Sequence, residues 1–260
     1  MEKIKLNLSG MDDFFTQEAY KVLRTNLQFC GQDIRVIAIT SCNENEGKTT
    51  IALHLAVSLA ELGKKVLVID ADMRKSVMAG RNTTAKNAKG LSEVLTGIEK
   101  LADCLYETQY PTLQLMFAGK YPPNPVELLS GKYFSALLGG TRKVYDYIIV
   151  DTPPLGRVID AAVVAPECDG VMLVIGDKNV RCRQAKEVVA QLEKGGSKIL
   201  GVVRNSTKKK SGAYYYYGKK YGYGGRKAGY GAAVNTVKHE EKKAADSNSG
   251  DSSQSAGDGQ

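Results

Sequence analysis

One stretch of the sequence has the residue types and the spacing of a phosphate-binding loop. The apolar run Val36–Thr40 leads through Ser41–Glu46 into Gly47-Lys48-Thr49-Thr50, and a helical pattern follows. In this strand–loop–helix order, backbone N–H groups and the helix N-terminus face a bound triphosphate. The lysine places a positive charge near the β- and γ-phosphates, and the threonine hydroxyl helps to hold Mg²⁺. The pattern G-x-x-x-x-G-K-[ST] is incomplete, because Cys42 stands where its first glycine belongs.

Acidic residues follow two further apolar runs. Val66–Ile69 leads into Asp70-Ala71-Asp72-Met73-Arg74, and Tyr147–Val150 leads into Asp151-Thr152-Pro153-Pro154. A single aspartate after a strand is commonly a helix cap or part of a surface turn. The carboxyl ends of parallel strands, however, meet at one edge of a sheet, where ligands bind in open α/β folds. Three converging strand ends therefore predict a site for ATP and Mg²⁺, with nucleotide contacts from Glu46, Gly47, Lys48, Thr49 and Thr50 and metal contacts from Thr49 and Asp151.

Short apolar runs alternate with amphipathic segments along the first 205 residues. Runs that are apolar on both faces are typical of parallel strands covered by helices on both sides. We expect strands at Val36–Thr40, Val66–Asp70, Leu113–Phe117, Tyr147–Asp151, Val171–Ile175 and Ile199–Val203. We expect helices at Gln17–Phe29 (with Thr16 as its N-cap), Thr49–Leu62, Pro125–Leu138, Arg157–Ala165 and Arg181–Lys194. This alternation predicts an α/β, three-layer P-loop fold with an open, mostly parallel sheet flanked by helices.

The charge of the chain is concentrated near its C-terminus. The net charge is +8, and residues 206–260 contribute +5 of it, from 10 Lys and Arg against 5 Asp and Glu. The rest of the chain gives little support to a nucleic-acid-binding face, and no nucleic-acid partner is expected. The five cysteines form no C-x-x-C pair, which fits a reducing compartment. Because neither a signal peptide nor an apolar run near the ~20 residues of a membrane span is evident, we expect a soluble, cytoplasmic protein.

The composition changes sharply after Asn205. Residues 206–260 are rich in Gly, Tyr, Lys and Ser, and such a segment cannot bury enough apolar surface to offset the entropy of ordering. We therefore predict a P-loop domain over residues 1–205 and a disordered tail over 206–260. Seven of the 14 tyrosines lie in this tail, at Tyr214, Tyr215, Tyr216, Tyr217, Tyr221, Tyr223 and Tyr230. Taken alone, tyrosines among lysines also suit RNA binding or aggregation.

The three strand-end motifs together resemble the MinD/ParA-like branch of P-loop proteins. In that branch the loop ending at Thr49 is the Walker A motif, Asp70-x-Asp72-x-Arg74 is Walker A′, and Asp151-Thr152-Pro153-Pro154 is Walker B. Within it, the chain is similar to the bacterial tyrosine kinases of capsule and exopolysaccharide synthesis, over roughly residues 12–230. The MinD and ParA ATPases carry a second lysine where this chain has Asn43. The segment Gly119–Leu129 resembles the proline-rich stretch of the kinases.

This resemblance implies roles for individual residues. Lys48, Asp70 and Asp72 are the expected catalytic residues, with Asp70 as the base and Asp72 as a further metal contact. The sequence itself does not decide between these two roles. Asn205 lies where relatives place an asparagine that contacts adenine, although an asparagine that begins a loop is also common for turn chemistry.

The resemblance also implies how the chain assembles and what it modifies. Glu18, Lys21 and Arg24 resemble the E-x-x-R-x-x-R motif by which these kinases form a ring, and spacings of three place them on one broad helix face. Lys21 replaces the first arginine and lacks its bidentate geometry. A solvated charged face is the alternative reading. The tail tyrosines are the expected phosphoacceptors, and each would enter the active site of another subunit.

Partners follow from the same resemblance. A kinase of this type is expected to be recruited to the inner face of the membrane by a separate transmembrane adaptor, to have a cognate tyrosine phosphatase, and to control capsular or exopolysaccharide synthesis and export. Two alternatives remain. One is a MinD/ParA-like regulatory ATPase without kinase activity, which Asn43 argues against. The other is a nucleotide-switched RNA-binding protein that uses its tail.

Overall fold

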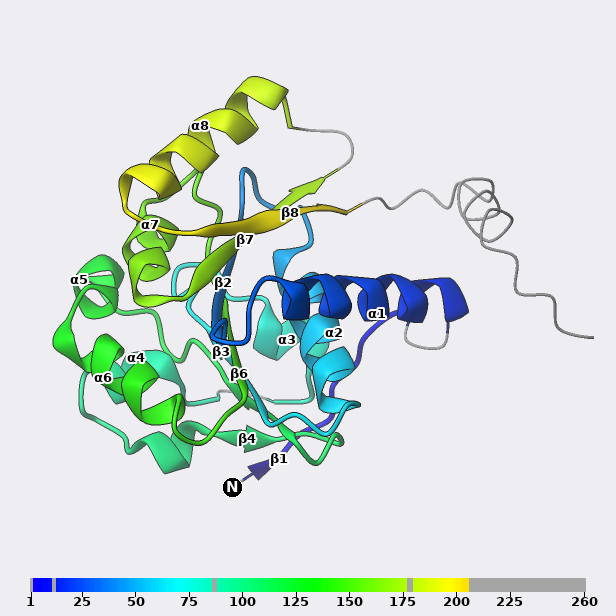
Figure 1. Cartoon of the computed structure of the whole chain (residues 1–260). Helices are drawn as coiled ribbons and strands as arrows, with labels where there is room; N and C mark the ends of the chain where they lie inside the picture. Colours follow the sequence, from blue (N-terminus) through cyan, green and yellow to red (C-terminus); the bar gives the residue numbers. More distant parts are fainter. Residues whose placement is uncertain (1, 11–12, 86–87, 177–179, 206–260) are drawn as a thin grey trace, which may run out of the picture. The chain divides into compact units, whose positions relative to one another are not determined.

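In the described part of the chain, the core is a sheet of eight strands. The computed structural model describes residues 2–10, 13–85, 88–176 and 180–205. The strands lie in the order β1-β4-β5-β3-β6-β2-β7-β8, and neighbours run parallel except for the antiparallel pair β4 and β5 (Figure 1). The strands span Glu2–Lys3 (β1), Val36–Ser41 (β2), Val66–Asp70 (β3), Tyr106–Glu107 (β4), Leu113–Met116 (β5), Tyr147–Asp151 (β6), Gly170–Gly176 (β7) and Ile199–Asn205 (β8).

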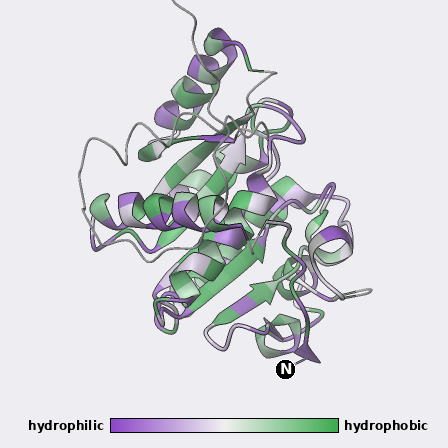
Figure 2. Ribbon diagram, turned by 90° about the vertical axis from the view of Figure 1, so that its right-hand side faces the viewer, coloured by the Kyte–Doolittle hydropathy of each residue, from purple (hydrophilic) through white to green (hydrophobic). Residues whose placement is uncertain are grey.

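All six predicted strands are present, within two residues at each end. Each residue of β2 and β3 is buried, as expected for strands covered on both faces. Figure 2 shows strands of the sheet in green, the colour of hydrophobic residues. Strands β1 and β4 were not predicted, because two-residue strands are too short to show a hydrophobic period.

Helices cover both faces of the sheet. Leu27, Ile51 and Met78 belong to a core cluster on one face, which α1, α2 and α3 cover, whereas α4 to α8 cover the other face (Figure 1). This arrangement confirms the predicted α/β layers. The helices span Phe14–Phe29 (α1), Lys48–Ala60 (α2), Met78–Asn82 (α3), Leu91–Leu95 (α4), Pro125–Leu129 (α5), Lys132–Thr141 (α6), Asp160–Val164 (α7) and Cys182–Lys194 (α8), with 3₁₀ turns at Leu101–Cys104 and Ala165–Glu167.

The predicted start of the first helix is wrong. Helix α1 begins at Phe14, and its N-cap is Asp13 rather than Thr16. The Asp13 carboxylate accepts hydrogen bonds from the Thr16 backbone N–H at 3.1 Å and from its hydroxyl at 2.7 Å. Both residues are typical of N-caps, but an aspartate three residues earlier satisfies the free N–H groups of the first turn.

Two other helix predictions need correction. The segment Pro125–Leu138 is two helices, α5 and α6, which meet at Ser130 and Gly131. A side chain at Gly131 would lie 3.2 Å from the backbone oxygen of Glu127, and this residue, the one glycine of the segment, leaves room for the turn between the two helices. The segment predicted from Arg157 forms a helix only from Asp160, and it ends in a 3₁₀ turn.

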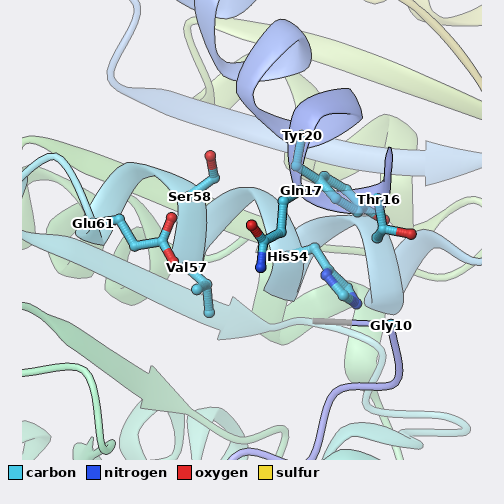
Figure 3. A pocket seen from close by; sticks show the side chains of 8 residues that line it. All are labelled: Gly10, Thr16, Gln17, Tyr20, His54, Val57, Ser58 and Glu61. Atoms are coloured by element: carbon cyan, nitrogen blue, oxygen red, sulfur yellow. The ribbon is translucent and has the colours of Figure 1, made fainter. Parts of the chain in front are cut away.

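Helix α1 packs along α2. The rings of Tyr20 and His54 stack at 4.6 Å between centroids with an interplanar angle of 9° (Figure 3). Burial raises the pKa of Tyr20 to about 12. Gln17 and Glu61 line a shallow groove beside this stack. The groove shares no residue with the predicted nucleotide site.

The predicted tail, residues 206–260, lies outside the described residues, so the structure does not test the predicted domain boundary after residue 205. Both stay predictions. In the part of the chain that the structure describes, no helix combines the length and the apolar character needed to cross a bilayer.

Candidate active site

The predicted phosphate-binding loop joins β2 to α2. Lys48 is the first residue of α2, and Thr49 and Thr50 follow in its first turn. Gly47 has a φ of 87° and Asn45 a φ of 60°, so both lie in the left-handed region. Glycine adopts that conformation without strain, and asparagine tolerates it better than most residues. The loop therefore leads through these two residues directly into the N-terminus of α2, in the strand–loop–helix order that the sequence predicts.

The acidic residues lie beside this loop because β3, β6 and β2 are neighbours. Asp70 at the end of β3 is aligned with Asp151 at the end of β6, and Asp151 is aligned with Ile39 of β2. The Thr49 hydroxyl donates to Asp151 Oδ2 at 2.5 Å. Asp151 Oδ1 is buried and has no hydrogen-bond partner among the described residues. The structure thus brings together Lys48, Thr49, Asp70 and Asp151.

Asp70 and Asp72 differ in their surroundings. Asp70 is 1% exposed and accepts hydrogen bonds from the Ser76 hydroxyl at 2.5 Å and from the Asp72 backbone N–H at 3.0 Å. Asp72 is half-buried, and its carboxylate accepts from the Lys75 backbone N–H at 2.9 Å. The loop after β3 therefore donates hydrogen bonds to both carboxylates, those of Asp70 and Asp72, from its own residues.

Burial and mutual repulsion shift the pKa values of this cluster upward. Burial and the neighbouring Asp151 raise the pKa of Asp70 well above its usual value, against the opposing effect of the Ser76 hydroxyl. Burial raises the pKa of Asp151 to about 6, although Lys48 and the Thr49 hydroxyl lower it. Burial also raises the pKa of Asp72, opposed by hydrogen bonding to Lys75. A bound cation would favour the ionised forms of these carboxyl groups and so lower their pKa values.

The residues present fit a bound Mg²⁺. Magnesium prefers oxygen ligands and usually binds proteins through one or two carboxylates. Asp151 offers an oxygen that bonds no other described residue, Thr49 a hydroxyl, and Asp72 a half-buried carboxylate on the neighbouring loop. These are the three residues that the sequence predicts as metal contacts.

Arg74 is bound to a residue that the sequence did not single out. Its Nε donates to Asp160 Oδ2 at 2.8 Å and to Oδ1 at 3.2 Å. The Asp160 side chain is fully buried, whereas that of Arg74 is 34% exposed. Because Asp160 begins α7, this ion pair connects the loop after β3 to the segment after β6.

Asn205 reaches the phosphate-binding loop. Its side-chain amide donates to the backbone oxygen of Glu46 at 3.0 Å. The predicted nucleotide residues Glu46 and Asn205 are therefore neighbours, although they are far apart in the sequence. Sequence reasoning missed Ser76, Asp160 and Gln184. Of these, Gln184 bonds the side chain of Asn43. Ser76 follows Arg74 so closely that its place on the motif loop was a usable signal, whereas nothing in the sequence marks the other two.

The three residues predicted for ring formation lie on α1, but their side chains make different contacts. Lys21 Nζ bonds Glu18 at 2.7 Å, and both side chains are partly exposed. Arg24 turns toward α2 instead, where its guanidinium donates to the Ser58 backbone oxygen at 2.7 Å. Ser58 is one of the residues that line the groove in Figure 3. The ring stays a prediction. The tail tyrosines lie outside the described residues, and their role stays a prediction as well.

Comparison with known proteins agrees with this geometry. A family model described as an AAA domain matches residues 34–194. Tyrosine-protein kinase CpsD of Streptococcus agalactiae is 42% identical over 203 residues, which cover 78% of this chain and 89% of CpsD.

Solved structures show the same relationship. The kinase domain of the Escherichia coli tyrosine kinase ETK has a TM-score of 0.71 and 32% identity, covering 80% of each chain. The septum site-determining protein MinD of Pyrococcus horikoshii, solved with Mg-ADP, has a TM-score of 0.56 and 27% identity, covering 66% of this chain and 70% of MinD. The predicted family resemblance is confirmed. This chain belongs to the bacterial tyrosine-protein kinases, and it is a protein-tyrosine kinase built on a nucleotide-binding P-loop fold.

Proposed function

We propose that this kinase transfers the γ-phosphoryl group of ATP to tyrosines of its own C-terminal tail, in another subunit. The observation that carries the proposal is the meeting of Lys48, the Thr49–Asp151 pair and Asp70 at one edge of the sheet. Phosphoryl transfer depends mainly on positioning and charge stabilisation, and these groups supply both. The acceptors are the seven tyrosines from Tyr214 to Tyr230.

Residues around the loop hold the nucleotide. Lys48 and the backbone N–H groups of Glu46, Gly47, Thr49 and Thr50 bind the phosphates, and Asn205 contacts the adenine. When bound, Mg²⁺ neutralises charge on the β- and γ-phosphates. Thr49, Asp72 and Asp151 hold it, directly or through water. The raised pKa values of Asp151 and Asp72 support this assignment, because a nearby cation restores their ionised forms.

Asp70 is the proton acceptor in this mechanism. Its Oδ2 accepts the Ser76 hydroxyl, and the tyrosine hydroxyl takes that place when the acceptor enters. The proton of the tyrosine passes to Asp70, the tyrosine oxygen bonds to the γ-phosphorus, and the bond from that phosphorus to the bridging oxygen breaks, leaving ADP. To bring the tyrosine hydroxyl next to the Asp70 carboxylate, only the side chain of Ser76 has to move aside.

The cellular role is also part of the proposal. Likeness to the capsule-type kinases supports a cytoplasmic enzyme that a separate transmembrane adaptor recruits to the membrane. A tyrosine phosphatase would remove the phosphate groups that this enzyme adds. Glu18, Lys21 and Arg24 would contribute to a ring of unphosphorylated subunits. Phosphorylation and its reversal would then regulate capsular or exopolysaccharide synthesis and export.

A regulatory ATPase without kinase activity is the competing function. Its mechanism uses a loop lysine that reaches a partner's nucleotide, and Asn43 stands at that place. Asn43 bonds Gln184 of its own chain, which further argues against a role across a dimer.

Phosphosite mass spectrometry tests the proposal. Purified protein is incubated with Mg-ATP at high protein concentration, with and without an adaptor's cytoplasmic peptide, beside a Lys48→Met variant. Phosphate on Tyr214–Tyr230 that requires Lys48 supports the kinase assignment and the tail as substrate. ATP hydrolysis without phosphotyrosine, even with the peptide, would favour the regulatory ATPase.

A further inference from the structure

A pair of side-chain amides fastens the phosphate-binding loop to helix α8. Gln184 Nε2 donates to Asn43 Oδ1 at 2.9 Å, and Asn43 Nδ2 donates back to Gln184 Oε1 at 3.4 Å. Both side chains are half-buried, so water competes only in part for these bonds. The partners are 141 residues apart in the sequence, so the pair joins two elements that the chain itself does not connect.

Two more contacts continue this pair across the loop. Glu46 Oε2 accepts the Asn43 backbone N–H at 2.9 Å, and the Glu46 backbone oxygen accepts the Asn205 side-chain amide at 3.0 Å. Asn205 is the last residue of β8. A chain of hydrogen bonds therefore runs from α8 through Asn43 and Glu46 to the end of β8.

Neighbouring residues pack closely against the phosphate-binding loop near these hydrogen bonds. A side chain at Gly47 would lie 2.1 Å from Asn205 Nδ2, and one at Gly156 would lie 2.1 Å from the Cys42 backbone oxygen. Glu46 is 3% exposed and packs against Gly176, whose added Cβ would lie 3.5 Å from Glu46 Cγ. The loop thus has little room to change its path without first breaking one of these contacts.

A loop of this sequence has a particular need for such support. Glycine at the first motif position lets the backbone bend freely, but here Cys42 is fully buried and Asn45 is in the left-handed region. A loop that already has its phosphate-binding path before the nucleotide arrives loses less free energy to ordering, and it therefore binds more tightly.

We propose that Asn43 and Gln184 are positioning residues for nucleotide binding, which act through Glu46 and Asn205 to hold the loop in its phosphate-binding path. The inference rests on the proposed nucleotide site and adds two residues that contact neither the phosphates nor the metal. Asn43 thereby acts within its own subunit, in contrast to a lysine that reaches a partner.

Direct nucleotide binding tests this inference. The dissociation constant of Mg-ADP is measured by calorimetry on the full chain, for the unaltered protein and for Asn43→Ala and Gln184→Ala, and kcat is measured at saturating ATP. Loss of the amide pair raises the dissociation constant about 3- to 10-fold, the effect of one or two neutral hydrogen bonds. The kcat value stays within about 2-fold, because the reacting groups are unchanged.

Two variants distinguish positioning from general damage. Arg183→Ala removes the neighbouring side chain of α8, which is 90% exposed and pairs with Glu187, and it leaves the dissociation constant unchanged. The exchange Asn43→Gln with Gln184→Asn keeps the combined length of the pair, and it restores binding to near the unaltered value.

Specific outcomes would overturn the inference. Unchanged Mg-ADP affinity in Asn43→Ala and Gln184→Ala would do so, as would weakened binding that the exchanged pair does not restore. In both cases the unaltered protein still binds Mg-ADP, and the proposed function stands. If the unaltered protein bound no Mg-ADP, the proposed function would fail and this inference with it.

Discussion

Asp70 and Asp72 are separated by one residue, yet only one of them is closed off from solvent. Asp70 is 1% exposed and held by Ser76 and by the backbone of Asp72, whereas Asp72 is half-buried. The motif gives both as acidic groups at a strand end and does not distinguish them. Their different surroundings support the proposed roles, with Asp70 as the proton acceptor and Asp72 as a group that reaches the metal.

Replacing Asp70 separates proton transfer from binding. Asp70→Asn keeps the shape of the side chain but removes its ability to accept a proton, so we expect phosphotyrosine formation to fall about 100-fold or more. Mg-ATP affinity should change only a few-fold, since Lys48 and Thr49 are untouched. Radiolabel transfer and calorimetry measure the two quantities, with the exposed Asp103→Asn as a control. Loss of nucleotide binding in Asp70→Asn would refute this division of roles.

The ion pair of Arg74 and Asp160 should matter for stability. Arg74→Ala leaves the fully buried Asp160 carboxylate without its partner. Because Arg74 itself is one-third exposed, the loss lies between that of surface and buried pairs, about 1–3 kcal/mol.

Urea unfolding of the Mg-free chain measures this loss. Arg183→Ala, which breaks an exposed pair, should cost about 0.5 kcal/mol or less. Adding Asp160→Asn to Arg74→Ala removes the unpaired charge and should recover part of the stability. Equal losses for the two arginine variants would show that the burial of Asp160 has no effect.

Single residues show what the sequence can and cannot predict about the site. Lys48, Asp70 and Asp151 were predictable, because strand order brings residues at strand ends to one edge. Asp160 and Gln184 were not, since each pairs with a residue 86 or 141 positions away and belongs to no motif. Such pairs depend on how elements pack, and one sequence does not show that.

At the scale of elements, the ends of helices are the features least visible in the sequence. Long apolar runs such as β3 and α2 were predicted closely, because burial on both faces leaves a clear pattern. The start of α1 was misplaced, since Asp13 and Thr16 are both good caps. The five-residue helices α3 and α4 were missed, because they contain too few turns to show a period.

The cap of α1 gives a prediction at this scale. Asp13→Ala removes the acceptor for the Thr16 backbone N–H, which should lower the free energy of unfolding by about 1 kcal/mol. Thr16→Val removes only the hydroxyl contact and should cost less. Thermal unfolding of both variants checks the order, and a larger loss for Thr16→Val would restore Thr16 as the cap.

Asp169 ties helix α6 to the start of strand β2. Its Oδ2 accepts the backbone N–H groups of Arg35 and Val36, each at 2.8 Å, and the Arg142 guanidinium at 2.9 Å. Burial alone would raise the pKa of Asp169, but the hydrogen bonds from Arg142 and from the two backbone groups outweigh it and hold the pKa below its usual value.

This pKa shift predicts a dependence of stability on pH. Because the pKa of Asp169 is lower in the folded state, the unfolded state binds more protons, and stability rises with pH in that range. The contribution is complete above the unfolded-state pKa of about 3.9 and is lost as the pH falls through the folded-state pKa. Asp169→Asn should therefore be less stable at pH 7 and lose less stability on acidification. Urea unfolding at several pH values measures this, and parallel curves for both proteins would contradict it.

At the scale of the whole molecule, the residues of the proposed nucleotide site lie at one edge of the sheet, where β3 and β6 end at Asp70 and Asp151. Asn205, which ends β8, bonds the phosphate-binding loop. The fold class and the family were within reach of the sequence. The ring stays a prediction, because Lys21 departs from the ring motif and Arg24 bonds Ser58 of its own chain.

The most direct test of the central claim is a mixing experiment that separates kinase from substrate. A full-length chain with its seven tail tyrosines changed to phenylalanine serves as kinase, and a full-length Lys48→Met chain serves as acceptor. Both are incubated with Mg-ATP and an adaptor peptide, and phosphopeptides are identified by mass spectrometry. We predict phosphate on Tyr214–Tyr230 of the Lys48→Met chain, in amounts that rise with protein concentration. Phosphate on the tail of the unaltered protein alone, and none in the mixture, would contradict transfer between subunits.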